Sequence, residues 1–264
     1  MSKKNKSGGE ERFEEYYSAL YGGRWPSLRS SLLLDEKEKV SPGGLKNPYY
    51  MDVSSLVTAS LLPVKRGMKV LDMCAAPGGK SLVLALALEG SGSLTSNDRS
   101  PERRRRMRDV FSLCLPDGAV DIKITGFNAE SWGLYEKNEY DSILLDAPCS
   151  SERHVMKDPK YLSQWSPSRP KRLSQSQYAM LSSALMAVKE GGYILYSTCS
   201  INRFENEAVI EKLFSRHGEE VEEIECSLFS SEPLEYGRII LPDTSGGLGP
   251  MYSCLLRKKV LNEE

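Results

Sequence analysis

The sequence predicts an α/β protein built on a seven-stranded, mostly parallel sheet with helices on both faces, as in Rossmann-like folds. From Gly67 onward, short apolar runs alternate with segments of helical periodicity, and polar or glycine-rich turns follow several of those runs. Alternating strands and helices of this length favour a parallel sheet covered on both sides. Ligands of such sheets bind beyond the carboxyl ends of the strands.

Residues 1–62 are expected to form a helical segment that packs on a catalytic domain of residues 63–264. Aromatic side chains at 13, 16, 17 and 21 follow helical spacing and are expected to pack in a core. Gly22, Gly23 and Pro26 interrupt that pattern. The expected elements of this segment are a helical region over 12–34, a loop over 35–50 and a short helix over 54–62.

The seven strands of the core are expected at 69–73, 93–96, 120–125, 142–145, 193–197, 221–224 and 251–256. Helices are expected between them at 81–88, 101–113, 173–188 and 205–215. Pro101 suits the first turn of its helix, because a proline there loses no intrahelical hydrogen bond. Residues 149–170 are polar and contain three prolines, so they are expected to form a long loop.

Composition narrows the class of protein. The net charge of −1 counts against a pure nucleic-acid-binding module, which usually carries a basic excess. The six cysteines include no C-x-x-C pair, so no metal site is expected. The sequence has only two histidines, which counts against a mechanism that uses histidine as the base. No apolar run reaches the roughly 20 residues of a membrane helix. The first residues lack an apolar stretch, so a cytoplasmic, non-membrane protein is expected.

A glycine turn after the first core strand predicts a nucleoside-bearing cofactor. Gly78 and Gly79 allow the backbone to approach a ligand closely, and Asp98, at the end of the next strand, can accept both hydroxyls of a ribose. A phosphate-binding P-loop is disfavoured, because Cys74 stands in place of its first glycine and Pro77 intrudes. The dinucleotide fingerprint G-x-G-x-x-G is absent. S-adenosylmethionine is the remaining common ligand, and a simple tight turn is the alternative.

Two further motifs follow predicted strands, and each contains a cysteine: Asp146–Ser150 reads Asp-Ala-Pro-Cys-Ser, and Ser197–Ser200 reads Ser-Thr-Cys-Ser. Together with Cys74–Lys80 they resemble the Nol/Nop/Sun (NSUN) family of RNA cytosine-5 methyltransferases. The resemblance runs from about Phe13 to the end of the chain. The signals most similar to the short branch that modifies mitochondrial ribosomal RNA are Arg153-His154 and Gly249–Tyr252.

The resemblance implies a class I S-adenosylmethionine-dependent methyltransferase fold and assigns roles to matching positions. Cys199 would be the nucleophile, and Cys149 would assist product release. Asp146 would hold the cytosine, and Lys80 would lie near Asp146 and the base. The cofactor would contact Cys74, Ala75, Ala76, Pro77, Gly78, Gly79, Lys80, Asp98, Asn128 and Asp146. Asn128 stands where the family usually has aspartate, which removes a charge from the adenine contact.

A thiol suits this chemistry because C5 of cytosine is a poor nucleophile. Addition of a thiolate to C6 makes C5 enamine-like, and a base must later remove the C5 proton so that the thiolate can leave. Spacing alone does not rank the two thiols. Cys114, Cys226 and Cys254 are expected to be small buried residues without a chemical role.

Ribosomal RNA is the expected substrate, with transfer RNA as the alternative. Candidate contacts to RNA are Arg153, His154, Arg169, Lys171 and Arg172. A monomer is expected, and an accessory protein could supply the RNA affinity that a near-neutral surface lacks. Two other classes stay open: an RNA-binding assembly factor without turnover, and a nucleotide-phosphate enzyme suggested by Gly79-Lys80-Ser81. A mitochondrial location is not excluded.

Overall fold

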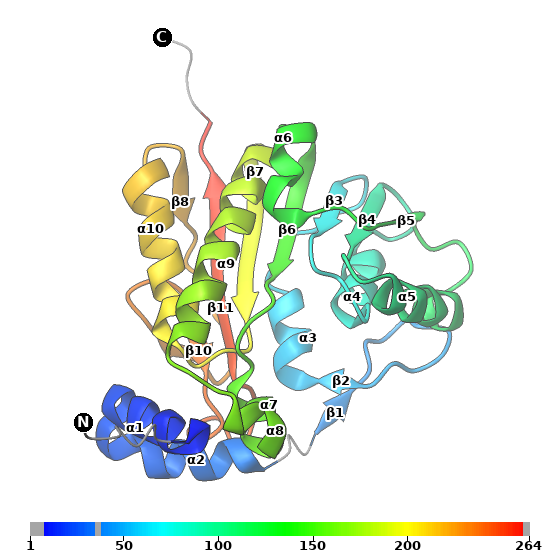
Figure 1. Cartoon of the computed structure of the whole chain (residues 1–264). Helices are drawn as coiled ribbons and strands as arrows, with labels where there is room; N and C mark the ends of the chain where they lie inside the picture. The colour runs from blue at the N-terminus through cyan, green and yellow to red at the C-terminus, as the bar shows by residue number, and fades with distance from the viewer. Residues whose placement is uncertain (1–7, 35–37, 261–264) are drawn as a thin grey trace, which may run out of the picture.

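The computed structural model describes residues 8–34 and 38–260 and has a mixed central sheet with helices on both faces (Figure 1). The order of the sheet is β5-β4-β3-β6-β7-β11-β10-β9, with β8 paired to β11. Strands β3 to β7 run parallel, and β11 is antiparallel to β7. The strands span Lys69–Asp72 (β3), Ser93–Asn97 (β4), Ile122–Thr125 (β5), Tyr140–Asp146 (β6), Val188–Thr198 (β7), Val221–Glu223 (β8), Glu232–Pro233 (β9), Arg238–Ile240 (β10) and Met251–Lys258 (β11).

The predicted fold class is confirmed. All seven expected strands are present, and β9 and β10 are two short additional strands at one edge of the sheet. Their sequences, Glu232–Pro233 and Arg238–Ile240, are too short to show strand periodicity.

Alternating side chains of the central strands supply two separate cores, as a pleated strand requires. Leu71 and Ile143 pack on one face, in the core that contains Leu181 of α9. Val70 and Leu144 pack on the opposite face with residues of α4. Because both faces are buried, successive residues such as Val70-Leu71 and Ile143–Leu145 are apolar, which is the pattern of a doubly covered parallel sheet.

The helices span Gly9–Tyr21 (α1), Trp25–Leu33 (α2), Val53–Ala59 (α3), Gly79–Ala87 (α4), Pro101–Cys114 (α5), Trp132–Tyr135 (α6), Glu152–Lys157 (α7), Pro159–Ser163 (α8), Ser168–Ala187 (α9) and Glu207–His217 (α10), with 3₁₀ turns at Gly22–Arg24 (η1), Ala129–Ser131 (η2) and Arg203–Glu205 (η3). Two short strands, Lys39–Val40 (β1) and Met51–Asp52 (β2), form a separate ribbon. Part of the expected loop over 35–50 therefore pairs as a strand.

The expectation of a long loop over 149–170 is wrong. This stretch contains α7, α8 and the start of α9. Pro159 and Pro170 lie in the first turns of α8 and α9, where a missing backbone N–H breaks no intrahelical bond. The prolines that indicated a loop therefore mark helix starts.

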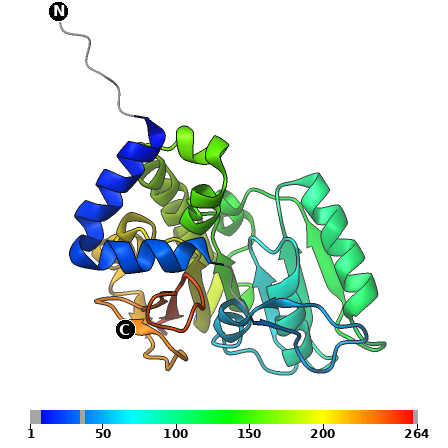
Figure 2. The same cartoon turned by 90° about the horizontal axis from the view of Figure 1, so that it is seen from below.

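The N-terminal helices lie across the lower end of the sheet in Figure 1 and are seen from below in Figure 2. Phe13 and Tyr17 are fully buried, and their rings pack against Trp165, which confirms the expected core role of these aromatic residues. The division at residue 62 stays a prediction. Within the described ranges, no helix is both long and apolar enough to cross a membrane.

Candidate active site

The turn from β3 into α4 requires glycine at two successive positions. Gly78 has a left-handed φ of 114°, and a Cβ there would meet the ring of Phe111 at 3.0 Å. A Cβ on Gly79 would approach the ring of Tyr49 to 2.7 Å. The turn is therefore packed under the segment that contains Tyr49, and α4 begins directly at Gly79.

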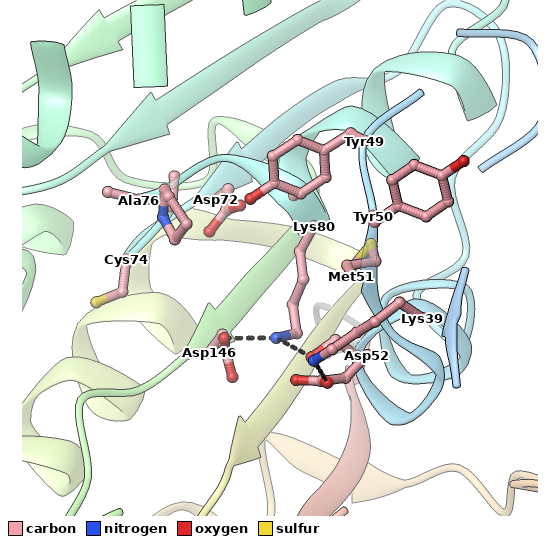
Figure 3. Close-up of a pocket in the computed structure, with 14 residues that line it drawn as sticks. Lys39, Tyr49, Tyr50, Met51, Asp52, Asp72, Cys74, Ala76, Lys80 and Asp146 are labelled. Carbon is pink, nitrogen blue, oxygen red and sulfur yellow. Dashed lines mark hydrogen bonds and ion pairs between the residues drawn. The ribbon is translucent and has the colours of Figure 1, made fainter. Parts of the chain in front are cut away.

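A cavity of about 290 Å³ opens in front of this turn (Figure 3). Lys80 extends through it and donates a 2.8 Å hydrogen bond to Asp146 at the end of β6. Ser197 of β7 donates to the other oxygen of Asp146 at 3.0 Å. Although burial lowers the pKa of Lys80, the Asp146 carboxylate raises it overall, so Lys80 stays cationic.

Asp72, the last residue of β3, lines the same cavity and was not singled out from the sequence. Ser81 donates to one of its oxygens at 2.7 Å, while the other oxygen, Oδ1, is buried without a hydrogen-bond partner. Burial raises the pKa of Asp72 to about 7, and the charge of Asp146 adds to the rise. An unsatisfied carboxylate oxygen beside a cavity fits the cationic amino group of S-adenosylmethionine.

The two motif cysteines meet where β6 and β7 end. These strands are neighbours, with Asp146 opposite Ser197, so the turns that follow them lie side by side. Cys149 Sγ and Cys199 Sγ are 3.0 Å apart. The hydroxyl of Ser151 lies 3.3 Å from Cys199 Sγ and 3.5 Å from Cys149 Sγ. Both thiols, Asp146 and Lys80 line one larger cavity of about 780 Å³.

The environment distinguishes the two thiols. Hydrogen bonds from the Cys149 thiol, and then from Ser151, lower the pKa of Cys199 against the opposing effect of burial. The contact with Cys199, together with burial, raises the pKa of Cys149. A thiolate is the nucleophilic form of cysteine, and the role of Cys199 as the nucleophile stays a prediction.

The other cysteines do not share this environment. Burial raises the pKa of Cys74, although this residue lines both cavities. Burial also raises the pKa of Cys114, Cys226 and Cys254. Cys114 and Cys254 are buried as expected, whereas Cys226 is only half-buried.

Three predicted cofactor contacts, Gly78, Asp98 and Asn128, are not among the residues that line either cavity. Asp98 is bound to Arg103 at 3.0 Å and accepts from the backbone of Ser100 at 2.8 Å, so a ribose would share or displace the arginine. Asn128 is exposed and begins η2, accepting from the backbone of Glu130 at 3.4 Å. Binding of a nucleoside here requires the cavity to extend toward β4 and β5.

The candidate RNA contacts separate into two groups. Arg153 and His154 line the larger cavity beside the thiols, together with Lys157, which sequence reasoning did not select. Arg169, Lys171 and Arg172 lie on the first turns of α9 and are not among the residues that line the cavity. The ammonium group of Lys171 is 5.2 Å from the ring centre of Phe204.

The described sheet and its helices have the fold of class I S-adenosylmethionine-dependent methyltransferases. Residues 59–256 match the family model described as "16S rRNA methyltransferase RsmB/F", and the chain belongs to this family. It is similar to the bovine 5-cytosine rRNA methyltransferase NSUN4, with 34% identity over 80% of this chain and 59% of the relative. A zebrafish relative named "tRNA (cytosine(34)-C(5))-methyltransferase, mitochondrial" is 32% identical over 82% of this chain and 62% of its own.

Among solved structures, the chain is similar to NSun6 from Pyrococcus horikoshii with SFG, an analogue of S-adenosylmethionine. The TM-score is 0.70 at 26% identity, over 81% of this chain and 53% of that one. The chain thus spans about three fifths of the curated relatives described above.

Proposed function

We propose that this chain methylates C5 of a cytosine in ribosomal RNA, with S-adenosylmethionine as the methyl donor. The observation that carries the proposal is the 3.0 Å contact between Cys149 and Cys199 beside the Lys80–Asp146 ion pair. A pair of thiols with a carboxylate at one cavity fits covalent activation of a pyrimidine. Membership of a ribosomal RNA methyltransferase family supports the substrate class.

The residues divide the work by their positions. Cys199, with its lowered pKa, adds to C6 of the cytosine. Asp146, fixed by Lys80 and Ser197, accepts a hydrogen bond from the exocyclic amine or from protonated N3 and stabilises charge that develops on the ring. The pKa of Cys149 is raised, so its thiol first passes its proton to solvent. As a thiolate it takes the proton from C5; the electrons of the C5–H bond form the C5–C6 double bond, and the bond between C6 and the sulfur of Cys199 breaks.

S-adenosylmethionine supplies an electrophilic methyl group when bound. Asp72 Oδ1 would accept from its amino group, the glycine turn would lie against its amino-acid portion, and Asp98 would hold its ribose. Arg153, His154 and Lys157 at the larger cavity would contact phosphates and so position RNA without reading its sequence. The target base must leave its stack to reach the thiols.

The first experiment incubates the protein with labelled S-adenosylmethionine and unmodified total RNA, followed by separation of the RNAs by size. Label in 5-methylcytosine of a ribosomal RNA is the expected result. Label confined to transfer RNA would mean that transfer RNA is the substrate, as in the name of the zebrafish relative. Cofactor binding without any transfer, even with added ribosomal proteins, would favour a non-enzymatic assembly factor.

Two substitutions test the assigned roles. Cys199→Ala should abolish transfer, because no other cysteine has a lowered pKa among the residues described. Cys149→Ala should leave the protein covalently attached to RNA as a slowly migrating band, because release is impaired. A Cys149→Ala protein that turns over normally and shows no band would reject the role given to Cys149.

The remaining expectations concern where and with whom the chain works. We propose a monomer acting in the cytoplasm, with mitochondria as the alternative that the zebrafish relative's name indicates. The near-neutral net charge of −1 supports an accessory protein that adds affinity for RNA.

A further inference from the structure

Two buried glutamates lie directly behind the thiols. Glu152 and Glu205 are both inaccessible to solvent, although charged side chains are seldom fully buried. The serines that follow the two cysteines, Ser150 and Ser200, are also fully buried, and their hydroxyl oxygens are 3.1 Å apart. Each serine hydroxyl is hydrogen-bonded to both carboxyl groups.

The carboxyl groups also reach across to each other's turn. Glu205 follows the Cys199 turn, yet its Oε2 accepts from the backbone of Ser150 at 2.9 Å. Glu152 follows the Cys149 turn, yet its Oε2 accepts from the backbone of Ile201 at 3.1 Å. The glutamate of each turn therefore holds the backbone of the other turn. The bond is made one residue after Cys149 in one turn and two residues after Cys199 in the other.

Groups from more distant elements complete this cluster. Tyr17 of α1 donates to Glu152 at 2.6 Å. Gln177 of α9 donates both to Glu205, at 3.0 Å, and to the carbonyl of Pro148, at 2.9 Å. Gln177 therefore links the backbone just before Cys149, at Pro148, to Glu205. The same carboxyl group of Glu205 holds the backbone just after Cys149, at Ser150.

The four contacts between the two serine oxygens and the two carboxyl oxygens need more protons than the two that the serines supply. A serine hydroxyl carries a single proton, so it can donate to only one of its partners at a time. Two ionised carboxylates in contact with the same oxygens would also repel each other. A neutral Glu205 reduces both problems, because its carboxyl proton can be donated to a serine oxygen and only one carboxylate then carries a charge.

We propose that Glu152 and Glu205 are positioning residues that share one proton and clamp the two thiol-bearing turns together. Neither glutamate is proposed to touch the substrate. The clamp, defined as Glu152, Glu205, Ser150 and Ser200, keeps the two sulfur atoms in contact. Its importance for catalysis rests on the proposed function, because the reaction needs both thiols at one pyrimidine.

The test measures how strongly the clamp holds the thiols together without using RNA or methyl transfer. Oxidised glutathione converts Cys149 and Cys199 into a disulfide: one S–S bond forms between them, one S–S bond of glutathione breaks, and two molecules of reduced glutathione leave with the protons. The equilibrium gives the effective concentration of one thiol at the other. Peptide mass spectrometry identifies this disulfide among the six cysteines.

Glu152→Ala and Glu205→Ala should each lower the effective concentration by about tenfold or more, whereas Glu205→Gln should stay within about threefold of the original protein. Glutamine reproduces the neutral acid, with one acceptor and one donor in place. Glu211→Gln is the matched control, because Glu211 lies nearby on α10 but pairs with Arg203 outside the clamp. Circular dichroism and thermal unfolding verify folding.

Folded alanine variants with an unchanged effective concentration would overturn the proposal. If neither folds, Ser200→Ala decides, since it removes one hydroxyl that joins the carboxyl groups. An unchanged value in that variant would overturn the proposal too. Methylation assays then give a separate readout: loss of kcat with an unaltered KM for RNA supports positioning. A protein that methylates nothing but shows the predicted thiol equilibria would reject only the proposed function.

Discussion

The cofactor-facing and thiol-facing halves of the site are assembled from different kinds of contact. In the cofactor-facing half, the continuous stretch Cys74–Lys80 supplies more of the lining residues than any other stretch, and Ser81 is only nine residues from its partner Asp72. In the thiol-facing half, bonds join residues 135 positions apart, as for Tyr17 and Glu152. The first half depends on backbone geometry, whereas the second depends on buried polar side chains that the whole fold brings together.

This difference teaches where each half is sensitive. A short motif tolerates changes elsewhere in the chain, because its turn is fixed by local sterics at glycine. A buried polar network loses its geometry when any member is left unsatisfied. Substitutions that separate cofactor binding from thiol placement therefore test the comparison directly.

Among the substitutions that test this comparison, the largest expected effect is at Asp146, where the two halves meet through Lys80. Asp146→Asn should reduce single-turnover methylation by about 10²-fold or more, because the ring loses a charged acceptor and Lys80 loses its partner. Asp141→Asn is the control, since Asp141 begins the same strand and pairs with Lys189. Equal loss in both variants would mean that strand β6, and not the site, had been damaged.

Glu205→Gln should change how stability depends on pH. Burial and the nearby charge of Glu152 raise the pKa of Glu205 from 4.5 to about 7. A raised carboxyl pKa contributes stability that is complete below pH 4.5 and is lost as pH rises through about 7. The linked free energy of unfolding is about 3 kcal/mol across this window.

Thermal unfolding between pH 4.5 and 8 checks this expectation. The variant should lose less stability than the original protein as pH rises, because an amide does not ionise. The titratable groups that face Glu205 are Glu152 of α7, Tyr16 and Tyr17 of α1, Tyr196 of β7 and Cys149. The pKa values of the three tyrosines and of Cys149 are raised from ordinary values that already lie above this pH range, so these groups do not ionise within it. Parallel stability curves for the two proteins would therefore contradict a protonated Glu205.

Asp72→Asn should act in the cofactor-facing half alone. We expect S-adenosylmethionine to bind about tenfold more weakly by calorimetry, because the amino group loses a charged acceptor. With a pKa of about 7, the original Asp72 takes up a proton below neutral pH, so affinity should fall on acidification and the variant should lack this fall. Its Cys149–Cys199 effective concentration should be unchanged; a drop would show that the halves are coupled.

The glycine turn and both motif cysteines could be selected from the sequence because each follows a strand and has a compact motif. The structure brings them to one cavity, and their roles stay predictions. It missed Asp72, which lies just before the motif and gains meaning only from its buried, unpaired oxygen. Glu152 and Glu205 gave no signal either, since isolated glutamates in polar stretches usually face solvent. Their burial results from packing of α1, α7 and α9 around the thiols, a long-range outcome that periodicity does not encode.

The smallest expected effect is that of Tyr17→Phe, which removes one hydroxyl and keeps the ring. The loss should be about 1–2 kcal/mol in the free energy of unfolding, since the bond donated to Glu152 and the 3.2 Å bond accepted from Asn202 both disappear. Tyr140→Phe is the matched control, because Tyr140 is equally buried and donates to Glu136, away from the thiols. Both variants should be destabilised, but only Tyr17→Phe should lower the Cys149–Cys199 effective concentration, by a factor of about three. Identical thiol equilibria in the two variants would mean that α1 only packs against the site. The thiols would then be positioned by the clamp residues without help from Tyr17.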